Sequence, residues 1–179
     1  MRRASPLLRF RHDDCWWIIR SVMTLSSPAG LFRIVATAEA ITWALLISSL
    51  IARAIDSSLA GLVSISGALH GFTFLSYGAM ALVVGINQRW PILRQGFGVF
   101  LAIVPFATVP FESWLRKKNL LDGGWRRDQS SDPRDQKLID KAFRWAINHP
   151  LLMFAGVLFA IVVVYNILLF LGPPTTWFN

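Results

Sequence analysis

The sequence of 179 residues is poor in the residues that build metal sites and disulfides. Its single cysteine, Cys15, excludes an intrachain disulfide and a cysteine-based zinc site. Its histidines, His12, His70 and His149, lie in different segments without metal-ligand spacing, so neither a metal nor a haem is expected. A glycine-rich phosphate loop, a Gly-x-Ser-x-Gly motif and a His-Glu-x-x-His motif are also missing. We therefore expect a protein that is not an enzyme and that holds no cofactor.

Hydrophobic residues, by contrast, make up 54% of the chain, above the roughly 45–50% of ordinary soluble domains. Residues 151–171 contain no Asp, Glu, Lys, Arg or His, and such a run is long enough to cross the hydrocarbon core of a bilayer as a helix. Further apolar segments occupy residues 31–55, 59–86 and 96–111. The pattern predicts an all-α, polytopic helical membrane protein with three to four hydrophobic helices and amphipathic helices at the membrane interface.

The third apolar segment allows two topologies. Residues 96–111 contain Pro105 and Pro110, which oppose a regular helix, although an extended helix over 93–115 is long enough for a kinked span. If this segment crosses, the Lys and Arg residues divide eight against ten between the two sides of the membrane. If it is re-entrant or lies along the surface, they divide seventeen against one, with a cytoplasmic N-terminus. Both alternatives stay open at this point.

Basic residues collect outside the apolar segments. The net charge of +8 suits an anionic membrane surface, so membrane lipids are expected as partners and nucleic acid is not. Trp16 and Trp17, followed by Arg20, predict an interfacial helix. Asp132 and Pro133 predict the start of a second amphipathic helix. Its apolar face would contain Leu138, Ile139, Ala142, Phe143 and Ala146.

The chain therefore divides into five predicted parts. These are a cytoplasmic basic segment with an interfacial helix (1–30), a membrane core (31–118), a basic loop with an amphipathic helix (119–149), a C-terminal transmembrane helix (150–172) and a tail (173–179). Within the core, helices are expected over about 31–55, 59–86 and 93–115.

Small residues line one face of the second apolar segment. Ser64, Gly71, Gly78 and Gly85 recur every seven residues, and Gly67 forms a Gly-x-x-x-Gly pair with Gly71. Such a face lets another helix approach closely in lipid. We predict that these residues pack against a helix, and the spacing leaves open whether that helix is part of this chain or of another protein.

Ionisable groups at membrane depth are few, and each should be paired, neutral or beside water because an isolated charge there is costly. They are Glu39, His70 and Glu112. If the first two segments form an antiparallel hairpin, the depths of Glu39 and His70 differ by only about 8 Å. A hydrogen bond between them, directly or through Tyr77 or water, is then within reach. A polar clamp is favoured over a proton relay, because relays need several acidic groups.

Four stretches of the core resemble a known family. They are Leu-Phe-Arg-Ile-Val-Ala at 31–36 with Glu39, His-Gly-Phe-Thr-Phe-Leu-Ser-Tyr at 70–77, Gln-Arg-Trp at 88–90, and 105–115. Together they resemble the small bacterial membrane proteins grouped as domain of unknown function 3817, over about residues 31–118. Members carry Asp before the closing Trp-Leu, whereas this chain has Glu112 two residues before Trp114.

The resemblance implies an accessory role. The family has no established enzymatic activity, and an actinobacterial member is similar in size and segment order to a factor associated with the respiratory supercomplex of cytochrome bc1 and aa3-type oxidase. We therefore predict a non-catalytic accessory subunit, or an assembly or stability factor, of a complex in the bacterial plasma membrane. Helical subunits of the bc1–aa3 supercomplex are the partners that the resemblance implies. The alternative is a small ion-coupled transporter that uses Glu39 and His70.

Overall fold

The computed structural model describes residues 27–171, so the predicted interfacial helix around Trp16 and Trp17 and the tail lie outside the described residues. Within 27–171 the chain contains helices and loops but no strand, which confirms the all-α prediction. The helices are α2 (Pro28–Ile55), η1 (Ser57–Leu59), α3 (Ala60–Asn87), α4 (Ile92–Phe100), η2 (Leu101–Ile103), α5 (Thr108–Lys117), η3 (Pro133–Gln136), α6 (Leu138–Asn148) and α7 (Pro150–Leu171), where η marks a 3-10 helix.

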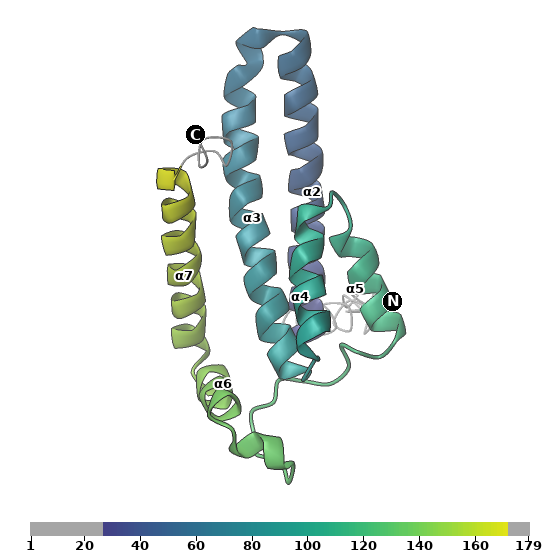
Figure 1. Cartoon of the computed structure of the whole chain (residues 1–179), viewed down its shortest axis with the longest axis vertical. Coiled ribbons are helices and arrows are strands. Elements are labelled where there is room, and N and C mark those ends of the chain that lie inside the picture. Colours follow the sequence, from purple (N-terminus) through teal and green to yellow (C-terminus); the bar gives the residue numbers. More distant parts are fainter. Residues whose placement is uncertain (1–26, 172–179) are drawn as a thin grey trace, which may run out of the picture.

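The chain is a multi-pass helical membrane protein. Three helical segments in the described part are long and apolar enough to cross a membrane, Pro28–Ile55, Ser57–Asn87 and Pro150–Leu171. The first two form the long antiparallel hairpin of Figure 1. Ser27 caps α2 by accepting a hydrogen bond from the Gly30 N–H at 3.0 Å, and Pro28 occupies the first turn, where its missing N–H costs nothing. At the turn, the Asp56 carboxylate accepts from the Ser58 N–H at 2.9 Å.

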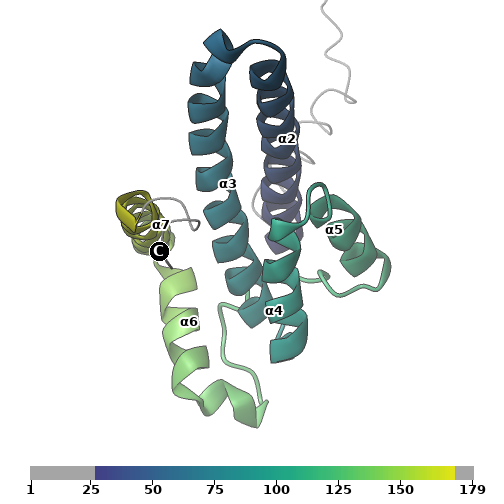
Figure 2. The same cartoon turned by 45° about the horizontal axis from the view of Figure 1, so that its top comes forward.

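The segment expected over 93–115 is two helices instead of one. α4 leaves the end of α3 and packs beside it, and η2 continues it to Ile103, whereas α5 returns in the opposite direction and packs against α2 (Figures 1 and 2). Val104 is extended and Phe106 has a φ of +64°, while Pro105 between them has no N–H to donate. The segment therefore forms a hairpin of two short helical pieces, a shape compatible with the re-entrant topology that the sequence allows. We refer to residues 92–117 as the re-entrant hairpin.

The buried core ties this re-entrant hairpin to α2 and α3. The Phe32 ring lies 5.5 Å from the Tyr77 ring and 6.1 Å from Trp90, which it meets edge-on. The Trp90 indole N–H donates to the Leu120 carbonyl at 3.0 Å, and its ring is also edge-on to Phe111. The core consists of Phe32, Ala36, Tyr77, Ala81, Val84, Trp90, Ala102, Phe111, Leu115 and Leu121.

The amphipathic helix differs in two ways from its prediction. Asp132 and Pro133 begin η3, and the extended backbone of Lys137 separates η3 from α6, because the Asp132 side chain caps Arg134 in a tight 3-10 turn. The buried face of α6 contains Phe143, Arg144 and Ile147. Leu138 and Ile139, which the spacing placed on the apolar face, are instead largely exposed, Leu138 to 82% and Ile139 to 68%. The reason is that α6 packs through the face that meets η3, α3 and α7, and its other face is left open.

Helix α7 stands beside α3 as a separate arm (Figures 1 and 2). Ile161 is its one buried residue. A helix with apolar residues on every side requires an apolar surrounding, which a bilayer or the helices of another subunit can provide.

Candidate functional site

A buried hydrogen bond joins α2 to the re-entrant hairpin at Glu39. The Glu39 side chain is fully buried, and its Oε2 lies 2.7 Å from Thr108 Oγ1 at the first turn of α5. The same hydroxyl lies 3.2 Å from the Ala36 carbonyl oxygen. Thr108 reaches α2 because the chain reverses at Phe106, two residues before it. This contact spans 69 positions of the sequence.

His70 belongs to a second polar group, one turn further along the hairpin. Its Nδ1 lies 3.2 Å from Thr42 Oγ1, and Thr42 Oγ1 lies 2.7 Å from Thr73 Oγ1. The Trp43 ring packs on the imidazole with its centre 4.3 Å away, and its indole N–H donates to the Ala102 carbonyl at 3.3 Å. These contacts join α2, α3 and η2.

The predicted hydrogen bond between Glu39 and His70 is not formed. The two groups are linked through Thr42, whose hydroxyl lies 2.9 Å from the Glu39 backbone carbonyl, and through Trp43, which packs on His70 and interacts with the Glu39 carboxyl group. Tyr77 is fully buried and interacts electrostatically with Glu39, but its hydroxyl has no hydrogen-bond partner in the described part of the chain. Sequence reasoning missed the threonines, because threonine hydroxyls usually bond to the backbone of their own helix and give no signal at a distance.

Glu112 lies apart from both groups. It is buried on α5, and the Arg116 guanidinium lies 3.4 Å from its Oε2. Glu39, His70 and Glu112, the three ionisable groups expected at membrane depth, therefore make separate contacts and do not converge on one centre, and of the three Tyr77 lies beside Glu39 alone. Within residues 27–171, no group of three or more His, Cys, Asp or Glu side chains could hold a metal ion.

A second interhelical hydrogen bond ties α2 to α3 nearer the hairpin turn. Ser49 Oγ and Ser66 Oγ lie 2.6 Å apart and are buried. Each hydroxyl also contacts a carbonyl of its own helix, at Leu46 and Val63. Hydroxyl pairs of this kind fix the register of neighbouring helices in lipid.

The small-residue stripe of α3 faces several helices of the same chain. A Cβ at Gly71 would lie 3.2 Å from Tyr165 Cε2 of α7, and Tyr165 Oη donates to the Ala68 carbonyl at 3.4 Å. Ser64 lines a groove between α3 and α7. The other glycines meet different helices: Gly67 faces Leu46 of α2, Gly78 faces Val99 of α4, and Gly85 lies against Gln95 of α4.

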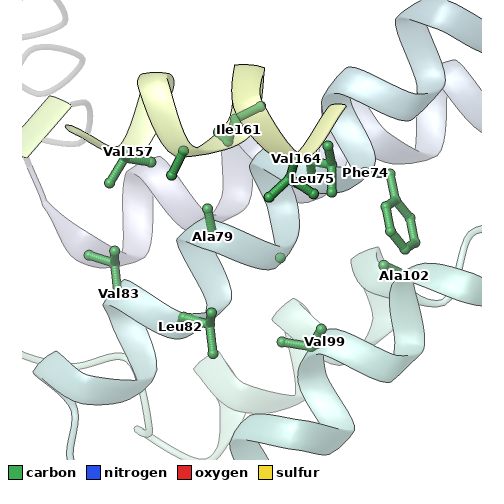
Figure 3. A pocket seen from close by; sticks show the side chains of 12 residues that line it. Phe74, Leu75, Ala79, Leu82, Val83, Val99, Ala102, Val157, Ile161 and Val164 are labelled. Atoms are coloured by element: carbon green, nitrogen blue, oxygen red, sulfur yellow. The ribbon is translucent and has the colours of Figure 1, made fainter. Parts of the chain in front are cut away.

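An apolar groove of about 390 Å³ opens between α3, the α4–η2 segment and α7 (Figure 3). Phe74 and Val83 mark its extent along α3, and Val99 and Ala102 form its opposite wall. Its lining is almost wholly hydrocarbon. The groove can hold an apolar chain, but it offers no charged group to orient a polar substrate.

An ionic cluster fixes the loop outside the membrane core. Asp135 is buried and forms ion pairs with Arg89, Arg126 and Arg144. Its carboxylate also accepts from the Ser130 N–H at 2.6 Å. The Ser130 hydrogen bonds, together with the guanidinium groups of Arg89 and Arg144, hold the pKa of Asp135 below its usual value.

The same cluster organises the end of α3. Arg89 adopts a φ of +53° and also pairs with Asp132. Arg126 donates to the carbonyls of Ile86 and Asn87 at 2.6 and 2.7 Å, which satisfies the open end of α3. Hydrogen bonds from Arg134 hold the pKa of Asp132 well below its usual range. Sequence reasoning described this loop only as basic.

Comparisons with known proteins agree with the membrane-core architecture. Residues 29–117 match the family described as "Domain of unknown function (DUF3817)". A Streptomyces coelicolor protein that carries only the provisional name of a membrane protein is 34% identical over 91 residues. The match covers 50% of this chain but 11% of that relative, so the chain spans a small part of its length. No solved structure matches the chain.

Proposed function

Residues 29–117 of this chain belong to the DUF3817 family of membrane proteins, and on this premise we propose that it is a non-catalytic accessory subunit or assembly factor of a plasma-membrane complex. The four core stretches resemble this family, and an actinobacterial member is similar in size and segment order to a factor associated with the bc1–aa3 supercomplex, so the respiratory chain is the specific proposal. The partners would be helical subunits of that complex, in contact with lipid and with this chain.

The observation that best supports this proposal is that Glu39 and His70 each hydrogen-bond to a side chain of a neighbouring helix. Glu39 is bonded to Thr108, and His70 is bonded to Thr42. The grooves beside α3 and α7 are apolar, so they offer no polar path through the membrane core. This arrangement supports a scaffold more than a transporter, which needs ionisable groups beside a water-filled cavity.

A large apolar surface supports docking on other helices. Around α7, side chains such as Phe154, Phe159 and Phe170 are well exposed. Helix association in lipid depends on close packing instead of a hydrophobic driving force. No atom of this chain lies within 4 Å of a Cβ built at Gly156. A helix of another subunit could therefore approach the α7 backbone closely at this glycine.

Co-purification from native membranes of the source bacterium tests the accessory role. A tagged chain is extracted in mild detergent, and the haem absorbance of the co-purified material is measured per tagged chain. The proposal predicts stoichiometric haem from cytochrome subunits. A Gly156→Leu variant should lose this haem while keeping its abundance, whereas Gly61→Leu at the hairpin turn, also in open space, should retain it. Recovery of a haem-free homo-oligomer would contradict the accessory role.

A flux assay tests the transport alternative. Purified chain is placed in proteoliposomes, and proton and cation fluxes are measured under an imposed gradient. The accessory role predicts no flux above empty vesicles. A flux that is lost in Glu39→Gln and retained in Glu112→Gln would instead establish transport.

The proposed orientation places the N-terminus in the cytoplasm. The ends of α3 and α5, the loop and α6 gather at one end of the α2–α3 hairpin (Figure 1). Arg53 is the one Lys or Arg of residues 27–171 near the opposite turn. This asymmetry follows the positive-inside rule. A membrane-impermeant maleimide should label Cys15 in inside-out vesicles and not in intact cells, and labelling from outside would reverse the orientation.

A further inference from the structure

Counting protons at Thr108 constrains the chemical state of Glu39. The Thr108 hydroxyl lies 2.7 Å from Glu39 Oε2 and 3.2 Å from the Ala36 carbonyl oxygen. A hydroxyl has one proton to donate, and a backbone carbonyl can only accept. If Glu39 is ionised, Thr108 can donate to only one of these two acceptors, and the Ala36 carbonyl then keeps only the hydrogen bond of its own helix. If Glu39 carries a proton, it can donate to Thr108, and Thr108 can then donate to Ala36.

The second carboxyl oxygen of Glu39 is equally informative. Glu39 Oε1 is buried and has no hydrogen-bond partner in residues 27–171, and the same holds for the Tyr77 hydroxyl. Trp43 also interacts with this carboxyl group, but its N–H donates to Ala102. An ionised carboxylate normally gathers several donors. An ionised Glu39 would have one clear donor, the Thr108 hydroxyl at Oε2.

No cation compensates a charge at Glu39 within the described part of the chain. From α3 it faces Tyr77, and His70 makes no direct contact with it but is separated from it by Thr42 and Trp43. From α5 the next ionisable group is Glu112, which is already paired with Arg116. An unpaired carboxylate buried among membrane helices is strongly disfavoured relative to its protonated form.

We propose that Glu39 is a proton-binding site at neutral pH: its neutral carboxyl group donates through Oε2 to Thr108, and Thr108 donates to the Ala36 carbonyl. The bound proton thereby connects the re-entrant hairpin to α2. Removal of the proton leaves the Thr108 hydroxyl as one donor for two acceptors and leaves a charge in an apolar site. This inference is independent of the proposed accessory role.

The sequence supplies a single-site probe, because Glu39 and Glu112 are its only two glutamates. In a Glu112→Gln variant labelled with glutamate carrying ¹³C at the side-chain carboxyl, the label reports Glu39 alone. Infrared and solid-state NMR spectra of this variant in lipid at pH 7 distinguish a carboxylic acid from a carboxylate. The matched control is Glu39→Gln, in which the label reports Glu112 beside Arg116.

The proposal predicts a protonated carboxyl band at pH 7 in Glu112→Gln that shifts in D₂O, and a carboxylate signal in Glu39→Gln. Thr108→Val should move the acid band by removing its acceptor, whereas Thr108→Ser should leave it near its original position. A carboxylate signal for Glu39 at pH 7 would overturn the proposal. The decisive spectrum comes from Glu112→Gln, which retains both Glu39 and Thr108. The test therefore does not depend on whether a Glu39 variant folds.

Discussion

Gly98 is the position at which the re-entrant hairpin should be most sensitive to one added methyl group. A Cβ at Gly98 would lie 2.9 Å from Phe111 Cε1 and 3.3 Å from Phe111 Cζ. The Phe111 ring cannot simply move away, because it packs against Trp90, Phe97 and Trp114 with ring centres 5.8 to 6.3 Å apart. Gly98→Ala should therefore separate α4 from α5.

The size of the effect follows from two opposing contributions. Overpacking in a well-packed site costs typically about 1–3 kcal/mol. Alanine is favoured over glycine within a helix by roughly 0.8–1 kcal/mol. Gly96→Ala supplies the control, because Gly96 is in the same helix and a Cβ there meets nothing within 4 Å. The difference between the two variants isolates the clash, so we expect about 1–3 kcal/mol.

Hydrogen exchange of residues 92–117 in lipid nanodiscs measures this difference locally. Because every 1.4 kcal/mol changes an equilibrium constant tenfold, exchange through local opening should be roughly 5 to 150 times faster in Gly98→Ala than in Gly96→Ala. Equal exchange in the two variants would refute the packing of Gly98 against Phe111.

Three further predictions concern the interhelical contacts and the loop. Asp135→Asn should lower the thermal midpoint of the loop at neutral pH, whereas Asp128→Asn, at an exposed position, should not. Because the pKa of Asp135 is lowered in the fold, its stabilisation is complete above the ordinary aspartate pKa and is lost as the pH falls through the lowered value; a wild-type midpoint no more acid-sensitive than that of Asp135→Asn would contradict this. Thr108→Val should weaken hairpin docking by about 1–3 kcal/mol, because it leaves the buried Glu39 carboxyl group without its hydrogen-bond partner, and exchange rates in Thr108→Ser should stay near wild type. Gly71→Leu should drive Tyr165 away and increase maleimide labelling of a cysteine placed on the α3-facing side of α7, and unchanged labelling would show that the two helices do not pack there.

The membrane spans are predictable from the sequence because their cause is local. Long runs without charge require a helix in lipid. The run over 151–171 is found as α7, which begins one residue earlier, at Pro150, and ends at the same residue, Leu171. For the third apolar segment, the break in the helix is predictable from the sequence but the direction of the chain after it is not. Pro105 and Pro110 indicate an interruption, and the sequence left a re-entrant hairpin and a kinked span both open. The reversal at Phe106 depends on backbone geometry that no pattern of residue types specifies.

The site is less predictable because its contacts are distant in the chain. Glu39 and His70 stand out as polar groups in apolar segments, but their partners Thr108 and Thr42 do not, since threonine is common in helices of membrane proteins. The spacing of the glycines predicts close packing without identifying the partner helix. Likewise, Asp135 resembles any surface aspartate until the loop brings three arginines around it.

The accessory role is tested most directly by native mass spectrometry of the tagged chain released from its own membranes. The proposal predicts that the 20.1 kDa chain is found within a larger assembly whose dissociation releases haem-bearing subunits. A spectrum containing only the chain itself, or integral multiples of its mass, from membranes that contain intact respiratory complexes would contradict it.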